Sequence, residues 1–105
     1  MRRGEVWWAN LPPPAGRRPV LLLSRDAAYK VRHSVTVAMI SRTIRGIPVE
    51  VKLGTGDGMP SECVVNLDDI LTMPKALLAE RLTTLADDKL ALVARATVFA
   101  LDLKL

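Results

Sequence analysis

The stretch GRRPVLLLS, residues 16–24, sets two arginines directly before a continuous apolar run. Its leucines do not alternate with polar residues, so we expect a strand over residues 20–24 that is covered on both faces. Gly16 lets the chain turn before the arginines, and Pro19 fixes its direction after them. Arginine binds phosphate well because its planar guanidinium offers several donors and stays charged at any working pH. The stretch therefore indicates either a phosphate site at a strand start or an exposed, solvated charge pair.

Length and composition favour one domain, residues 1–105, because half of the 105 residues are hydrophobic. The net charge of +4 is a weak indication of a polyanionic partner. The single cysteine, Cys63, excludes an internal disulfide and is expected to be a small buried hydrophobe. With His33 as the only histidine and no metal-binding spacing of acidic residues, we expect no metal and no cofactor. Neither a signal peptide nor a run of membrane-spanning length is visible, so we expect a soluble, cytoplasmic protein.

Apolar patterning around this stretch predicts a strand-rich chain with one terminal helix. The five predicted strands cover residues 6–11, 20–24, 35–40, 49–53 and 63–73. Residues 26–30 are expected to form a short helical turn. Residues 54–58 are interpreted as a hairpin connection, because a phosphate-binding loop would need a lysine and a following helix. The fold class is therefore mainly β with a C-terminal helix (α+β), most simply a small antiparallel β-barrel.

Two details of this pattern bear on function and packing. Asp68 and Asp69 are adjacent, so in a strand we expect them to point to opposite faces, where they cannot share one proton. The helix over residues 87–103 has Ala86 where a capping residue is preferred, and Thr84 is the candidate cap. Its predicted packing face consists of Leu90, Val93, Ala94, Thr97, Val98 and Leu101.

Several segments in register resemble the MazF/PemK family of toxins. They are residues 3–7, 17–24, 40–51, 63–70 and 82–85, and together they span essentially the whole chain. The resemblance implies an SH3-like barrel of the CcdB/PemK type that forms a homodimer. It also implies the toxin of a type II toxin–antitoxin module, with a cognate MazE-like antitoxin whose acidic C-terminal tail blocks the RNA groove.

The activity implied by the resemblance is a metal-independent, sequence-specific endoribonuclease that cuts single-stranded RNA. Messenger RNA is the usual substrate of the family, and transfer or ribosomal RNA is an alternative. The 2′-hydroxyl of the substrate attacks the adjacent phosphate and leaves a 2′,3′-cyclic phosphate and a 5′-hydroxyl end.

The family's catalytic arginine corresponds to Arg18, and its catalytic threonine corresponds to Ser41. A guanidinium at Arg18 would stabilise the charge that accumulates on the phosphorane oxygens. The implied RNA-binding residues are Arg17, Arg42, Thr43 and Arg45. One departure is the short first loop, residues 12–16, which lacks the acidic residue that many relatives carry there.

Three questions stay open at the level of the sequence. One of Trp7 and Trp8 is expected in the core, and the other could stack on a base or lie at a dimer contact. A CcdB-type gyrase poison shares the barrel, but its tryptophan-bearing C-terminal tip has no counterpart here, because both tryptophans are N-terminal. The second alternative is a catalytically weak RNA-binding barrel, which the serine at position 41 and the short loop keep open.

Overall fold

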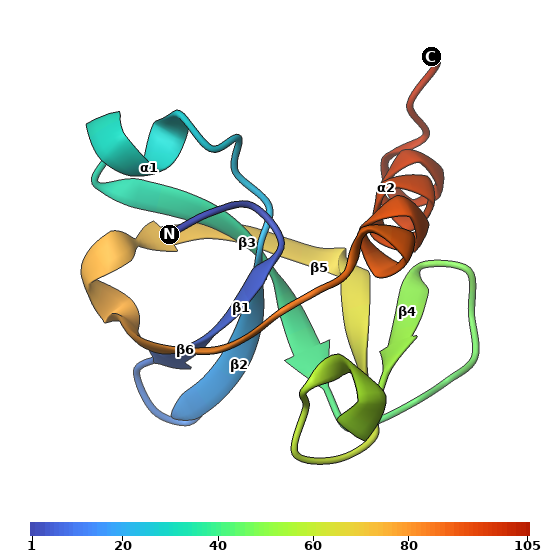
Figure 1. Ribbon diagram of the computed structural model, residues 1–105, viewed down its shortest axis with the longest axis horizontal. Helices are drawn as coiled ribbons and strands as arrows, with labels where there is room; N and C mark the ends of the chain where they lie inside the picture. Colours follow the sequence, from blue (N-terminus) through green and yellow to red (C-terminus); the bar gives the residue numbers. More distant parts are fainter.

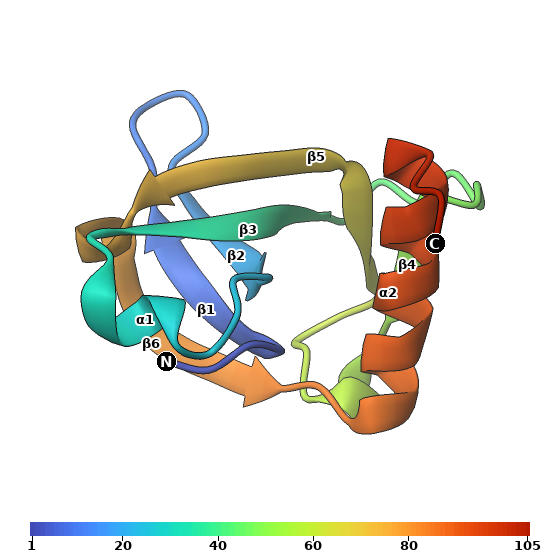
Figure 2. The same ribbon diagram turned by 90° about the horizontal axis from the view of Figure 1, so that it is seen from above.

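An antiparallel six-stranded sheet, in the order β4-β5-β3-β2-β1-β6, forms the body of the computed structural model, which describes residues 1–105 (Figure 1). The strands are β1 Glu5–Asn10, β2 Arg17–Leu22, β3 Ser34–Ser41, β4 Glu50–Leu53, β5 Cys63–Pro74 and β6 Leu78–Thr84. Two helices, α1 Ala28–Val31 and α2 Asp87–Leu101, lie at opposite ends of the curled sheet (Figure 2). Short 3-10 turns, η1 Thr55–Asp57 and η2 Lys75–Leu77, follow β4 and β5. The structure thus confirms the mainly β fold with a C-terminal helix.

Strand β2 is covered on both faces, as its unbroken apolar run predicted. Leu21 packs into one core cluster, whereas Val20 and Leu22 pack into a second cluster on the other face. The strand begins earlier than expected, so that Arg17 and Arg18 lie inside it and pair with β1. The arginines are therefore held by the sheet and do not merely precede it.

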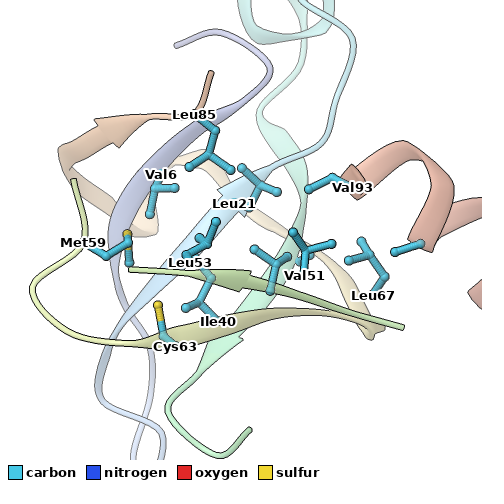
Figure 3. Packing of buried hydrophobic residues seen from close by; sticks show 13 residues of the cluster. Val6, Leu21, Ile40, Val51, Leu53, Met59, Cys63, Leu67, Leu85 and Val93 are labelled. Carbon is cyan, nitrogen blue, oxygen red and sulfur yellow. The ribbon is translucent and has the colours of Figure 1, made fainter. Parts of the chain in front are cut away.

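The larger core cluster lies between the sheet and α2. Ile40, Leu67 and Val93 are almost fully buried there, since each exposes 2% or less of its surface. Figure 3 shows Met59 and Cys63 at one end of this cluster and Val93 at the other. The expectation that Cys63 is a buried small hydrophobe is confirmed.

A bulge interrupts β5 at the two aspartates. The register between β3 and β5 shifts after Ala38, which pairs with Ile70, while Met39 pairs with Asn66. Residues 67–69 are left without a partner on β3, and Asp68 and Asp69 are both exposed. A bulge bends its strand and breaks strict alternation, and β5 changes direction beside α2 (Figure 2). The regular alternation on which the expectation of opposite faces rests is therefore interrupted here, and both carboxylates are exposed to solvent.

The buried face of α2 also differs from the prediction. Val93 and Ala96 are buried, and Leu90 and Ala100 pack partly against the larger cluster. Ala94 and Leu101 are exposed, so their assignment to the packing face is wrong. Alanines lie on several sides of this helix, so the spacing of apolar residues does not by itself identify the buried face. The contacts with the sheet determine which of the alanines are buried.

The helix begins without a side-chain cap. Its N-cap residue is Ala86, and no side chain hydrogen-bonds to the first turn from that position. The expectation that Thr84 caps the helix is wrong, because Thr84 is the last residue of β6 and pairs with Glu5. Asp87 and Asp88 lie in the first turn, where negative charge stabilises the positive end of the helix dipole.

Strand β6 had no clear signal in the sequence, because four of its seven residues are exposed and charged side chains interrupt it. It pairs with β1 through a register that shifts twice. The predicted hairpin connection between β4 and β5 is confirmed, and it contains the turn η1. Gly58 ends η1 with φ +87, and a Cβ there would come within 2.3 Å of the Thr83 hydroxyl. None of the helices has the length and apolar character needed to cross a membrane.

Candidate functional site

A pocket of about 500 Å³ lies beside the ends of β2 and β3. It is lined by Trp8, Ala15, Arg17, Arg18, Pro19, Ile40, Ser41, Arg42, Met59, Pro60, Ser61 and Cys63. Four of the six predicted site residues, Arg17, Arg18, Ser41 and Arg42, therefore meet in one place, from two separate segments of the chain. Thr43 and Arg45 follow on the same loop as Arg42 but do not line the pocket.

Arg18 is half-buried and is held across the gap between two strands. Its backbone pairs with Ala9 of β1, and its Nη2 donates a hydrogen bond of 3.0 Å to the carbonyl oxygen of Ile40 on β3. The paired part of β2 and β3 begins only at Val20, so this side chain bridges the strands just beyond their ladder. A guanidinium has five N–H donors, and this is its single hydrogen bond in the structure. Arg18 is thus oriented and keeps donors for a ligand.

Ser41 is the last residue of β3 and stands beside that bridge. It pairs with Val64 of β5, and its Oγ accepts a hydrogen bond of 3.0 Å from the backbone N–H of Thr43. This contact uses the hydroxyl oxygen as an acceptor and leaves its proton free to be donated. The serine both shapes the start of the following loop and offers a donor to an anion in the pocket.

Arg17 lies at the outer edge of the pocket, between an aromatic ring and a carboxylate. Its guanidinium carbon is 4.9 Å from the centroid of the Trp8 ring, and its Nη2 donates to Oε1 of Glu80. Glu80 is the direct partner of Trp8 in the β1–β6 ladder. Both members of the ion pair are largely exposed, so the pair contributes little to stability. Its effect is to orient Arg17 over the ring.

The two tryptophans have different surroundings, which answers a question that the sequence left open. Trp8 lines the pocket. Trp7 packs against the second core cluster, and its Nε1 donates a hydrogen bond of 2.9 Å to Oε1 of Glu5. Burial raises the pKa of Glu5, but the bonds from Trp7 and Arg2, with the positive N-terminus and Arg81, outweigh it and leave the pKa below the ordinary value. Trp8 is the tryptophan available to a ligand.

The floor of the pocket includes Met59 and Cys63, which belong to the larger core cluster. Burial, with a smaller contribution from the negative charge of Asp57, raises the pKa of the Cys63 thiol. The thiol is therefore protonated near neutral pH and acts in packing. Nowhere in the chain do three or more His, Cys, Asp or Glu side chains gather in a way that could hold a metal ion.

Sequence reasoning missed Glu80, which pairs with Arg17 but does not line the pocket, and the lining segment 59–61. No local signal marked either, because β6 was not predicted and the 59–61 segment looks like an ordinary loop. The lining itself contains three arginines and hydroxyls but no carboxylate and no imidazole. Such an arrangement can bind a phosphate and stabilise negative charge that develops on it.

Comparison with known proteins gives one consistent family. The sequence family described as PemK-like, MazF-like toxins of type II toxin–antitoxin systems matches residues 2–99. The chain is 43% identical over 101 residues to a probable endoribonuclease, MazF5, of Mycobacterium tuberculosis, covering 95% of this chain and 92% of that one.

Solved structures agree with this result. The Mycobacterium tuberculosis toxin MazF-mt6 superposes with a TM-score of 0.88 at 31% identity, covering 96% of this chain and 99% of that chain. An endoribonuclease in complex with its cognate antitoxin, from a mycobacterial species, gives a TM-score of 0.88 at 27% identity, covering 100% of this chain and 98% of the other.

Proposed function

We propose a specific reaction for this chain, which belongs to the PemK-like, MazF-like toxins of type II toxin–antitoxin systems and is an endoribonuclease. The reaction is metal-independent, sequence-specific cleavage of single-stranded RNA. The 2′-hydroxyl oxygen forms a bond to the adjacent phosphorus, and the bond from phosphorus to the 5′ oxygen breaks. The products are a 2′,3′-cyclic phosphate and a 5′-hydroxyl end.

The observation that carries this proposal is the position of Arg18 beside Ser41. The hydrogen bond from Arg18 to the carbonyl of Ile40 fixes the guanidinium at the end of β3 before any substrate arrives. Donors that are already oriented stabilise a transition state more than donors that must reorganise. We assign to Arg18 the stabilisation of the charge on the phosphorane oxygens, and to Ser41 a hydrogen bond to the same phosphate.

The reaction also removes a proton from the 2′-hydroxyl and delivers one to the 5′ oxygen. Arg18 is a poor base because a guanidinium stays protonated at any working pH. The lining offers no carboxylate or imidazole in its place. We therefore assign the proton transfers to solvent and keep for Arg18 an electrostatic role.

RNA binding is assigned to the residues around the catalytic pair. Arg17 and Arg42 line the pocket and would contact neighbouring phosphates, and Trp8 offers a ring for base stacking. Thr43 and Arg45 lie on the exposed loop that leads away from the pocket, so we place them along the path of the strand.

Partners follow from the same surface charges. The arginines that would bind RNA also favour an acidic peptide, and we propose that a MazE-like antitoxin covers them with an acidic C-terminal tail. We also propose a homodimer. Its support here is one flank of α2, where Leu92 and Phe99 lie two helical turns apart and expose 41% and 61% of their surfaces.

The test is to incubate the purified protein with a long single-stranded RNA in chelator, beside Arg18→Ala, and to map the ends. We expect discrete cuts with 2′,3′-cyclic phosphates from the wild type and no visible cuts from the variant over the same time. Intact RNA that is still bound would favour the catalytically weak RNA-binding barrel. Intact RNA without binding would favour the gyrase poison, which is tested by capture of DNA gyrase.

A further inference from the structure

The connection between β3 and β4 carries three of the six proposed site residues, yet it has little structure of its own. Residues 42–48 are all exposed and belong to no helix or strand. Arg42, Thr43 and Arg45 lie on it. An exposed, irregular loop of this kind samples many conformations unless particular contacts restrict it.

Two side chains supply such contacts, one at each end of the loop. At the start, Ser41 accepts a hydrogen bond from the N–H of Thr43. Near the end, Oε1 of Glu50 accepts two hydrogen bonds of 2.9 Å, from the N–H groups of Arg45 and Gly46. No other side chain hydrogen-bonds to the backbone of residues 42–48. The second anchor is the stronger one, because one carboxylate oxygen accepts from two backbone donors.

Glu50 is itself held firmly by the sheet. It is the first residue of β4 and pairs with Asn66 of β5. Its own N–H donates a hydrogen bond of 3.0 Å to the carbonyl oxygen of Ile47, which closes the turn before the strand. Val49, directly before it, is buried, and its carbonyl oxygen accepts from the N–H of Leu67 at 2.8 Å. Because the backbone of Glu50 is fixed in the sheet, its carboxylate holds this end of the loop in a defined position relative to β4 and β5.

We propose that Glu50 is a positioning residue for RNA binding, which holds the backbone at Arg45 and Gly46 so that the loop is preformed when RNA arrives. This inference rests on the proposed function of the site. A loop that is ordered in advance loses less conformational entropy on binding, so its contacts contribute more to affinity. Glu50 lies outside the pocket and acts through the loop, which predicts an effect on affinity rather than on the chemical step.

Two substitutions at Glu50 form a matched pair, because they differ in whether a hydrogen-bond acceptor remains. Oε2 of Glu50 is buried and has no hydrogen-bond partner. Glu50→Gln keeps an acceptor oxygen for the two loop N–H groups and has almost the same shape. Glu50→Ala removes the acceptor. Both variants remove the same negative charge, so any difference between them isolates the anchor from the general attraction of RNA to a more basic protein.

The experiment measures cleavage kinetics, binding of a labelled single-stranded RNA, and amide exchange for the wild type, Glu50→Ala and Glu50→Gln. For Glu50→Ala we expect KM and Kd to rise about tenfold, as for loss of hydrogen bonds to a charged group, with kcat within twofold of wild type. Exchange at the amides of Arg45 and Gly46 should become faster. Glu50→Gln should fall between the wild type and Glu50→Ala in binding and in exchange, because its amide oxygen still accepts but makes weaker hydrogen bonds than a carboxylate.

Three outcomes would overturn the proposal. They are an unchanged Kd in Glu50→Ala, equal impairment of both variants, and a fall in kcat at unchanged KM, which would indicate only a smaller folded fraction. If the proposed ribonuclease function is wrong, the wild type itself leaves the RNA intact, which distinguishes this case from the three outcomes above. In that case the Kd values and the exchange at residues 45 and 46 still test whether Glu50 orders the loop for binding.

Discussion

The two sides of the pocket are built in different ways. On one side Arg17, Arg18 and Ser41 belong to strands, and their backbones are fixed by ladder pairs with Asn10, Ala9 and Val64. On the other side begins the exposed loop of residues 42–48, of which only Arg42 lines the pocket. Its side-chain anchors lie only near its two ends. Groups that stabilise a transition state need close positioning, whereas groups that only bind the RNA strand can lie on a loop that a few side-chain contacts order.

This difference in construction implies a division of labour. We expect changes on the strand side to lower the rate of cleavage of bound RNA. Changes on the loop side should weaken binding and leave that rate nearly unchanged. Substitutions on each side of the pocket therefore test this division.

Arg18→Ala should have the largest effect. Loss of a preorganised donor to a developing oxyanion lowers the rate by about 100-fold to 1,000-fold. Arg18→Lys is the matched control, because it keeps the charge but loses the planar fork that reaches the carbonyl of Ile40. Cleavage rates should be compared after circular dichroism shows that both variants are folded. Cleavage by Arg18→Ala within a few-fold of wild type would contradict the assignment.

Ser41→Ala should follow, with a fall in rate of about 30-fold, as for loss of a hydrogen bond to a charged group. Ser41→Thr keeps the hydroxyl and restricts χ1, so it should cleave at least as fast as the wild type. Both variants are assayed on the RNA that gives the clearest cuts. Full activity in Ser41→Ala would show that the Ser41 hydroxyl takes no part in cleavage.

The strand side of the pocket was also the part that the sequence predicted best. An unbroken apolar run after two arginines indicated a doubly covered strand, and β2 is one. The resemblance of the segments around Arg18 and Ser41 to a known family placed both residues, and the structure brings both into one pocket. In this part of the molecule the local sequence pattern and the three-dimensional structure indicate the same residues.

Long-range register accounts for most of what could not be predicted. Glu80 meets Arg17 only because β6 pairs with β1 through two register shifts, and β6 itself has no apolar alternation. The exposure of Asp68 and Asp69 depends on a bulge opposite Ala38 and Met39. Neither feature leaves a mark in the local sequence.

Arg42→Ala and Arg45→Ala test the loop side and should weaken RNA binding by a few-fold each. If an arginine binds one phosphate of single-stranded RNA, its removal should reduce the slope of log K against log salt by about 0.7. Arg42 should have the larger effect, since it lines the pocket and Arg45 does not. Titration at several salt concentrations measures both the affinity and the slope. An unchanged slope in both variants would show that the loop does not bind the RNA backbone.

Glu5 offers a test that should alter stability without altering the loop. Its pKa is lowered in the folded protein, so its stabilisation is present above the ordinary glutamate pKa and is lost as the pH falls from there through the lowered value. Glu5→Gln should cost about 1 kcal/mol at neutral pH, the size of one net hydrogen bond, and less in acid. Urea unfolding at both pH values measures the difference. A cost that does not shrink in acid would contradict the role given to the carboxylate.

The division between the two sides is tested most directly by single-turnover cleavage at saturating enzyme, with Arg18→Ala and Arg45→Ala compared on the same RNA and with Kd measured in parallel. We expect Arg18→Ala to cleave bound RNA about 100-fold more slowly with Kd within a few-fold of wild type. Arg45→Ala should bind more weakly and cleave at the wild-type rate once saturated. A wild-type rate in saturated Arg18→Ala, or a slow rate in saturated Arg45→Ala, would contradict the account.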